Sequence, residues 1–172
     1  MENYRKGKNV EEPMEKSKIP IPNLPNEFLW MQVRGGSKIR NLLDHAFKNF
    51  EQSKVVVWSG SGPSIGKSIT CVEIMKREYK QQLHQINKIC YTNVDEYWDP
   101  ESLDLDQLVV KRKLPMVHIC LSSEKLSDNE LGYQAPSEVI PFRGQNMQKQ
   151  PGNGRNLSRS STSQRSTDNR MR

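Results

Sequence analysis

The feature that most constrains the fold is the stretch from Lys54 to Tyr79, in which an apolar strand pattern runs through a glycine-rich turn into a long helical pattern. Its consecutive apolar residues, Val55 to Trp58, are typical of a strand that is covered on both faces. A turn of this kind places unpaired backbone N–H groups at the positive end of a helix dipole, where they attract phosphate. The stretch therefore predicts a strand–turn–helix unit that faces a phosphorylated partner.

The same turn ends in Gly66-Lys67-Ser68, which is also the ending of the nucleotide-binding Walker loop, so a small nucleotide-dependent enzyme is one hypothesis. The Walker pattern needs a glycine five residues before Gly66, but position 61 is serine. The best later strand, Met116 to Leu121, ends in serines rather than in the aspartate that holds magnesium. We therefore predict that the chain is not an enzyme and has no catalytic residue, metal site or cofactor.

The charge of the chain is unevenly distributed. Its net charge of +6 favours an acidic partner such as nucleic acid. Residues 143–172 contain seven of the 26 Lys and Arg residues and one of the 20 Asp and Glu residues, so the rest of the chain is neutral overall. We predict a flexible, proline-rich segment at residues 1–26, a nucleic-acid-binding domain at 27–136 and a disordered basic Arg/Ser-rich tail at 137–172.

Apolar periodicity within the central domain predicts the element order βαβαββ. An alternating strand from Phe28 to Arg34 leads through a glycine pair to a helix for which Ser37 is the expected N-cap. The later elements are predicted as a strand at Lys54–Ser59, a helix at Ser64–Gln82 and strands at Ile86–Trp98 and Met116–Leu121. An acidic run followed by a basic one separates the last two strands and suggests an exposed β-hairpin arm. This order favours a mixed α/β sheet.

The second helical pattern offers a candidate partner surface. Cys71 and Ile74 lie beside its main apolar stripe and widen it, as expected if a partner covers them.

The three cysteines of the chain are widely spaced and form no C-x-x-C motif, so neither a disulfide framework nor a zinc site is predicted. No segment reaches the roughly 20 apolar residues of a membrane helix, so we expect no membrane contact.

Two landmarks together resemble the Alba family of small nucleic-acid-binding proteins. The first is the block Gly35 to Leu43, and the second is Gly60-Ser61-Gly62 with Ile65 and Lys67 downstream. The opening Met1 to Lys6, the block Val33 to Leu43 and Gly132-Tyr133-Gln134 are similar to one branch of that family, the larger Alba-type subunits of eukaryotic ribonuclease P and ribonuclease MRP and their paralogues. Pro63 and Gly66 depart from the residues that the family usually has in its second turn.

The resemblance implies an Alba-type βαβαββ two-layer α/β domain and a non-catalytic subunit that binds structured RNA. It implies a heterodimer with the smaller Alba-type subunit, contact with other ribonuclease P and MRP proteins, a role in precursor tRNA and rRNA processing, and a nuclear, nucleolar location. A general Alba-type chromatin or mRNA binder is the alternative. The family's contacts with nucleic acid fall here on Arg34, Gly36, Ser37, Lys38, Arg40, Asn41, Gly60, Ser61, Gly62, Lys67, Lys111, Arg112 and Lys113.

Overall fold

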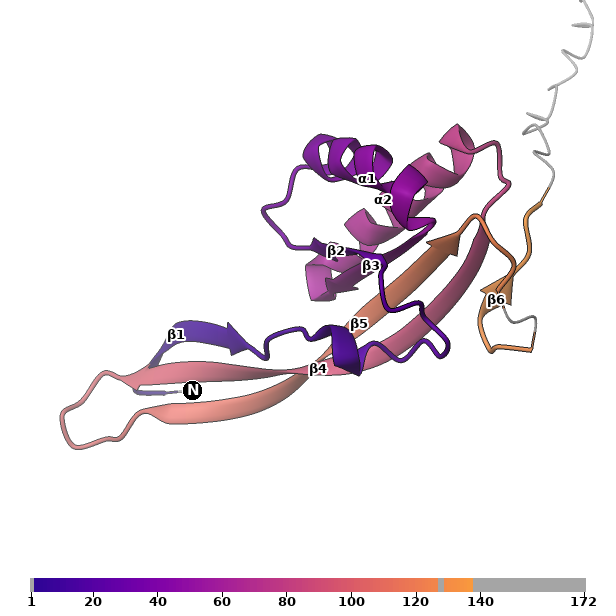
Figure 1. Ribbon diagram of the computed structural model, residues 1–172. Coiled ribbons are helices and arrows are strands. Elements are labelled where there is room, and N and C mark those ends of the chain that lie inside the picture. The colour runs from indigo at the N-terminus through magenta and orange to yellow at the C-terminus, as the bar shows by residue number, and fades with distance from the viewer. Residues whose placement is uncertain (1, 127–128, 138–172) are drawn as a thin grey trace, which may run out of the picture. The chain divides into compact units, whose positions relative to one another are not determined.

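The computed structural model describes residues 2–126 and 129–137. In chain order its elements are β1 (Tyr4–Glu11), β2 (Leu29–Val33), α1 (Ile39–Ser53), β3 (Val55–Ser61), α2 (Ile65–Glu78), β4 (His84–Pro100), β5 (Leu108–Ser122) and β6 (Tyr133–Gln134), with short 3-10 turns at Lys16–Lys18 and Gly62–Ser64. Both helices lie on one face of the sheet (Figure 1). The predicted Arg/Ser-rich tail lies outside the described residues, apart from its first residue.

The strands form one sheet in the order β1-β4-β5-β3-β2, and β6 pairs with β4. β2 and β3 are parallel, whereas the other pairs are antiparallel, so the predicted mixed α/β sheet is confirmed. Val33 at the end of β2 lies opposite Gly60 near the end of β3. Because these two strands run in the same direction, the segments that follow them leave the sheet at the same edge.

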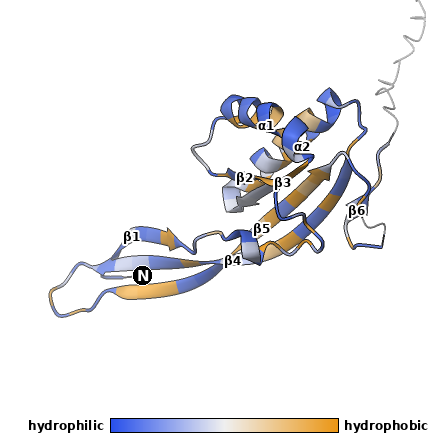
Figure 2. Cartoon of the chain, in the orientation of Figure 1, coloured by the Kyte–Doolittle hydropathy of each residue, from blue (hydrophilic) through white to orange (hydrophobic). Residues whose placement is uncertain are grey.

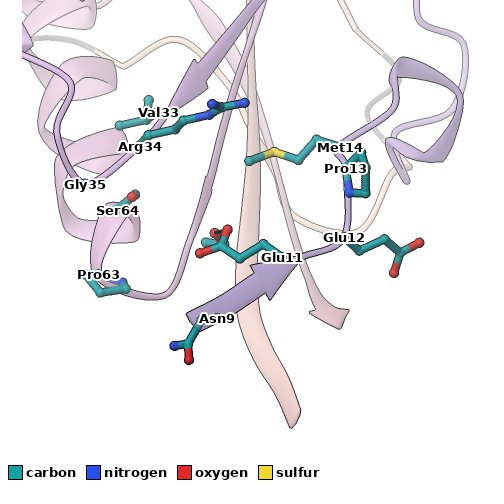
Figure 3. A pocket seen from close by; sticks show the side chains of 11 residues that line it. Asn9, Glu11, Glu12, Pro13, Met14, Val33, Arg34, Gly35, Pro63 and Ser64 are labelled. Atoms are coloured by element: carbon teal, nitrogen blue, oxygen red, sulfur yellow. Dashed lines mark hydrogen bonds between the residues drawn. The ribbon is translucent and has the colours of Figure 1, made fainter. Parts of the chain in front are cut away.

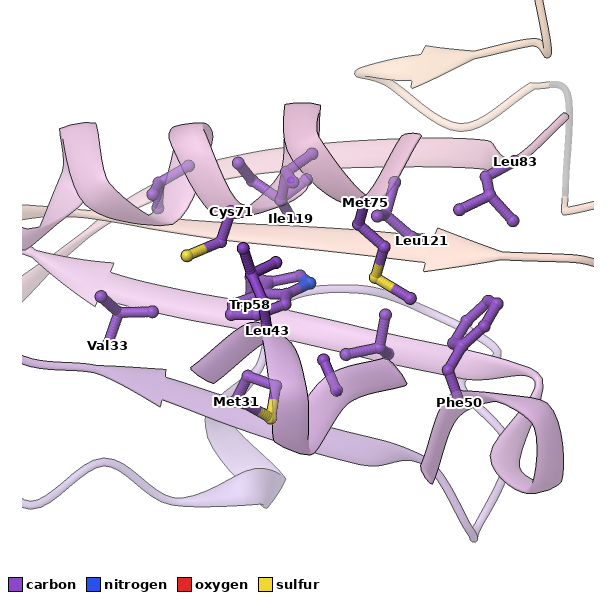
Figure 4. Close-up of a cluster of buried hydrophobic side chains, with 14 residues drawn as sticks. Met31, Val33, Leu43, Phe50, Trp58, Cys71, Met75, Leu83, Ile119 and Leu121 are labelled. Carbon is purple, nitrogen blue, oxygen red and sulfur yellow. The ribbon is translucent and has the colours of Figure 1, made fainter. Parts of the chain in front are cut away.

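The main core lies between the helices and the sheet (Figure 4). Phe50 of α1, Met75 of α2, Trp58 of β3 and Leu121 of β5 belong to it, and each is at most 2% exposed. Side chains of this kind stabilise a fold by about 1.5–3 kcal/mol each when they are fully buried. The two-layer arrangement that the family resemblance implies is therefore present.

The opposite face of the sheet is covered by the N-terminal segment. Ile19 and Ile21 are buried there with Val57 of β3 and Cys120 of β5. All residues of β3 are consequently buried, as its run of apolar residues predicts. The expectation of a flexible segment at residues 1–26 is wrong where β1 and these isoleucines lie. Pro20 between the isoleucines and Pro22 after them favour an extended backbone, which turns both isoleucine side chains toward the sheet.

β4 and β5 continue beyond the core as a long antiparallel ladder that runs from His84 opposite Ser122 to Trp98 opposite Leu108. β1 adds a third strand along the outer edge of β4. We call residues 4–11, 92–100 and 108–114 the arm. β5 starts at Leu108 rather than at the predicted Met116, because its apolar first residues continue the strand pattern. Figure 2 shows this hydrophobic start of β5, followed by a hydrophilic band.

Candidate nucleic-acid interface

Two short segments follow the parallel strands at one edge of the sheet. The β2–α1 loop comprises residues 34–38, and the β3–α2 turn comprises residues 62–64. Each was predicted from its glycines and cations to contact nucleic acid. The structure brings the two segments together, but the cations of the loop are exposed, whereas the turn is closed by packing.

The β2–α1 loop is exposed and closes on itself. The Ser37 N–H donates to the Arg34 carbonyl at 3.0 Å, and the Arg34 N–H donates to Ser37 Oγ at 3.2 Å. Ser37 is therefore not the N-cap that the sequence predicts, since the helix begins at Ile39 and Lys38 holds the cap position without a side-chain bond. The hydroxyl is already engaged with the loop, which leaves the first N–H groups of α1 uncapped by a side chain.

Three cations surround this helix start. Arg34, Lys38 and Arg40 are exposed, and none of them forms an ion pair within the part of the chain that the structure describes. Asn41 and Gly36 are exposed beside them. Unpaired cations next to a helix N-terminus form a surface on which phosphate groups are stabilised.

The β3–α2 turn is closed by packing. Gly60 and Ser61 are buried in β3, and a Cβ on Gly60 would overlap with Ser68 Oγ and come within 3.1 Å of the Ser64 carbonyl oxygen. That hydroxyl donates to the same carbonyl at 3.1 Å. Gly60 therefore allows α2 to approach β3 closely, and it offers no backbone N–H to a ligand from the surface. Gly62 follows with φ +47°, a backbone conformation that favours glycine.

Lys67, in the first turn of α2, connects the two segments through hydrogen bonds. Its Nζ donates to the carbonyl oxygens of Gly35 at 2.7 Å, Ser37 at 2.7 Å and Arg34 at 3.4 Å. An ammonium group has three donors, so all of them are used by the β2–α1 loop. This geometry opposes both the predicted phosphate contact of Lys67 and the Walker-loop hypothesis, in which the same lysine holds a nucleotide.

The arm carries the remaining predicted site residues on its strands. Lys111 and Lys113 are exposed on one face, whereas Arg112 lies on the other with its Nε 2.7 Å from Glu96 Oε2. Lys6 of β1 also pairs with Glu96, at 3.1 Å. These two cations neutralise Glu96, the most deeply buried carboxylate of the acidic run. The acidic run therefore repels phosphate from the arm less than the sequence alone suggests.

Sequence reasoning missed the cations that β1 adds to the arm. Lys8 lies 5.1 Å from the ring centroid of Tyr97, and Lys6 lies 6.0 Å from that of Trp98. Arg5 is exposed opposite Asp99. The only signal for them was a weakly apolar, lysine-containing stretch at the N-terminus, which resembles a charged tail as closely as it resembles an edge strand.

Of the two predicted partner residues, one is fully buried and the other is partly buried. Cys71 is 0% exposed in the main core, so its assignment to a partner surface is wrong, and Ile74 is partly buried against the same core. The buried side of α2 includes Ser68, a polar residue, which explains why the apolar stripe misplaced the face.

Other apolar side chains are exposed in this region. Ile69 of α2 is 45% exposed, and Ile89 and Tyr91 of β4 are 80% and 69% exposed. Ile89 pairs with Val117, a residue of the main core, so it lies on the helix-bearing face of the sheet. Ile69 is two residues from Lys67, so it points away from α1, toward the side of β4. We call Ile69, Ile89 and Tyr91 the α2–β4 apolar surface.

Burial favours the neutral forms of His118 and Cys120 in the core. Trp30 Nε1–H donates to Ser59 Oγ at 2.8 Å, and this oxygen lies 2.8 Å from His118 Nδ1. The Ser59 oxygen accepts from the indole, the direction of its hydrogen bond with His118 depends on the imidazole tautomer, and burial lowers the pKa of His118. Burial likewise raises the pKa of the Cys120 thiol to about 12.

Within residues 2–126 and 129–137 no group of His, Cys, Asp or Glu is arranged to hold a metal ion, and no helix could cross a membrane.

Comparison with known proteins places these features in context. A family model described as Alba matches residues 29–93. The chain is 45% identical over 140 residues to the ribonuclease P protein subunit p25-like protein of Homo sapiens, which covers 79% of this chain and 83% of that protein. It is 35% identical over 156 residues to ribonuclease P protein subunit p25 of Rattus norvegicus, covering 80% and 78% of the two chains. The solved structure of Alba from Thermoplasma volcanium matches with a TM-score of 0.41 and 12% identity, over 56% of this chain and 99% of that one.

Proposed function

Because this chain belongs to the Alba family, with p25 and p25-like ribonuclease P subunits among its relatives, we propose that it is a non-catalytic RNA-binding subunit of ribonuclease P and ribonuclease MRP. In this role it supports the processing of precursor tRNA and rRNA in the nucleus and nucleolus, and the catalytic RNA performs the cleavage. The observation that carries the proposal is the set of unpaired cations around the start of α1.

The RNA-binding face combines the β2–α1 loop with the arm. Arg34, Lys38 and Arg40 surround the helix start, and Lys111 and Lys113 lie on the strand that leaves the core at the same edge of the sheet. Cations fixed on rigid elements can contact phosphates of a folded RNA in a set register. Backbone contacts of this kind position a structured RNA without reading its sequence.

The first test removes two of these cations. The double variant Lys38→Ala/Arg40→Ala should bind a structured ribonuclease P or MRP RNA arm more weakly. Its affinity should also depend less steeply on salt, and the log–log slope should decrease by about 0.7–0.9 for each phosphate that the variant no longer binds. Fluorescence anisotropy at several salt concentrations measures both quantities.

The matched control is the double variant Lys48→Ala/Lys80→Ala. It removes the same charge from exposed positions away from the loop, one later in α1 and one after α2. If both double variants changed the slope equally, general charge rather than the helix start would bind the RNA. A preference for duplex DNA over every structured RNA would favour the alternative, a general Alba-type chromatin binder.

We further propose that the α2–β4 apolar surface binds the smaller Alba-type subunit. Ile89 and Tyr91 lie side by side on one face of β4, and Ile69 adds an apolar group from α2. Burying such side chains stabilises an association by about 1.5–3 kcal/mol each. Ile89→Asp should therefore abolish co-elution with that subunit in size-exclusion chromatography, whereas Leu131→Asp, at an equally exposed leucine, should not. Unchanged co-elution of Ile89→Asp would reject this surface.

A further inference from the structure

A pocket lies between β1 and the two segments at the sheet edge (Figure 3). Glu11, Pro13 and Met14 line it from the N-terminal side, and Val33, Arg34 and Pro63 line it from the sheet edge. Its volume is about 550 Å³, which lies within the range of small-molecule sites. Neither backbone contact with RNA nor heterodimer formation requires this space.

Two opposite charges line the pocket without neutralising each other. The Glu11 carboxylate accepts one long hydrogen bond, from Ser61 Oγ at 3.4 Å, and it forms no ion pair within the described residues. The Arg34 guanidinium is likewise unpaired there. Figure 3 shows Glu11 between β1 and the β3–α2 turn, with the Arg34 side chain extending across the pocket above Met14. Both groups are therefore available to a ligand.

The neighbouring carboxylate provides a contrast. Glu12 also lines the pocket, but in Figure 3 its carboxylate extends to the opposite side from Glu11, and it accepts hydrogen bonds from Lys18 Nζ and Asn93 Nδ2, each at 2.9 Å. These contacts hold the pKa of Glu12 below its usual range. The two adjacent glutamates therefore differ: Lys18 and Asn93 engage the Glu12 carboxylate, whereas the Glu11 carboxylate is left available to a ligand.

The combination matches the shape and chemistry of a nucleobase. Met14, Val33 and Pro63 supply apolar walls, and a guanidinium plane stacks well on a base. A carboxylate only accepts hydrogen bonds, so it selects a base edge with adjacent donors. Guanine presents two, N1–H and the N2 amino group. Adenine and cytosine present one amino group beside a ring nitrogen acceptor, and the carbonyl oxygens of uracil would repel the carboxylate.

We propose that this pocket binds one unpaired guanine of the RNA, with the Glu11 carboxylate accepting hydrogen bonds from N1–H and N2–H while Arg34 stacks against the ring. This inference rests on the proposed RNA-binding function and adds one base-specific contact to it. Arg34 belongs to both the pocket and the cation cluster, so a base in the pocket is continuous with a backbone bound at the start of α1.

The test uses the full chain and a set of stem–loop RNAs that differ only at one unpaired nucleotide. That position carries guanine, inosine, adenine or uracil. Inosine keeps N1–H but lacks the 2-amino group, so it removes one of the two expected hydrogen bonds. Wild-type protein should bind the guanine RNA at least about fivefold more tightly than the adenine and uracil RNAs, as expected for a bidentate contact, with inosine between them.

Glu11→Gln should reduce this preference to less than about twofold, because an amide offers one acceptor and one donor in place of two acceptors. Glu12→Gln removes the same charge from the adjacent residue and should keep the full preference. Equal binding of all four RNAs by wild-type protein, or a preference that survives in Glu11→Gln, would overturn the guanine site and leave RNA binding intact. Failure to bind any of the RNAs would overturn the proposed function as well.

Discussion

The β2–α1 loop and the β3–α2 turn look alike in sequence and differ in the structure. Both follow parallel strands, both contain glycine, and each has a lysine close to the start of the helix that follows, Lys38 at the N-cap of α1 and Lys67 in the first turn of α2. In the loop the cations are exposed and unpaired. In the turn the lysine, the serine hydroxyl and the glycine are all used to hold the protein together. A glycine-rich turn with a lysine therefore identifies a phosphate site only when its donors are left free.

The largest effect on stability that separates the two segments is expected from Gly60→Ala. The new methyl group would overlap with Ser68 Oγ beside the Ser64 carbonyl, and overpacking of this kind costs about 1–3 kcal/mol, here near the upper end because backbone is involved. Urea denaturation measures the loss. Gly66→Ala is the control, because its Cβ meets open space and alanine favours the helix by up to about 1 kcal/mol. Equal stability of the two variants would show that the turn is not closed by packing.

A smaller loss, of about 2 kcal/mol, is expected from Lys67→Met, which keeps an apolar chain but removes the ammonium group. Hydrogen bonds to a charged group contribute about 1.5–3 kcal/mol, and this lysine donates to three carbonyl groups. Thermal unfolding measures the change. Lys48→Met, an exposed position later in α1, should be nearly neutral. If Lys67→Met kept full stability and lost only RNA affinity, the lysine would be a phosphate contact after all.

A smaller effect is expected from pH, through His118 of β5, which lies opposite Ser59 on the strand that leads into the closed turn. Burial lowers its pKa in the folded state, so its contribution to stability is present above the unfolded-state pKa of about 6.5 and is lost as pH falls below that value. The free energy of unfolding should decrease between pH 7 and pH 5. His118→Gln should remove much of this slope, and His45→Gln, at an exposed position, should retain it. Identical slopes in all three proteins would exclude His118 as the cause.

The smallest effect on stability is expected from Lys38→Met in the open loop. An exposed cation without a partner contributes within about 0.5 kcal/mol, although its removal should still weaken RNA binding. Comparison of Lys38→Met with Lys67→Met by the same unfolding measurement is the most direct contrast between the two segments. A matching loss of stability in both variants would remove the distinction between an open loop and a closed turn.

The central part of the fold follows from local patterns. Alternation predicted a strand from Phe28 to Arg34, where β2 spans Leu29–Val33, the consecutive apolar residues predicted β3, and helical periodicity predicted α1. Each of these sequence patterns exists because apolar residues at regular spacing are buried against a neighbouring element. The pattern of one element therefore also predicts that a neighbour covers it. The parallel pairing of β2 and β3 then follows from the helix between them.

The errors have a different physical origin. β1 gains its order from β4, a partner far along the chain, and most of its own residues are exposed, so no local pattern marks it. The buried side of α2 includes Ser68, which apolar periodicity cannot detect, and Cys71 was therefore placed on the wrong side. The pocket at Glu11 could not be predicted, because it requires β1 to lie beside the β3–α2 turn.

The pairing of β1 with β4 also has a consequence for the order of folding. Tyr4 pairs with Pro100, so the strand that is synthesised first has a partner that appears much later. Contacts of such large sequence separation form slowly, because closing the intervening chain costs entropy. During synthesis from the N-terminus, β1, Ile19 and Ile21 can therefore reach their final positions only after β4 and β5 have paired. The pocket beside Glu11 therefore assembles only after β4 has formed, whereas the cation cluster at the start of α1 belongs to elements that are synthesised earlier.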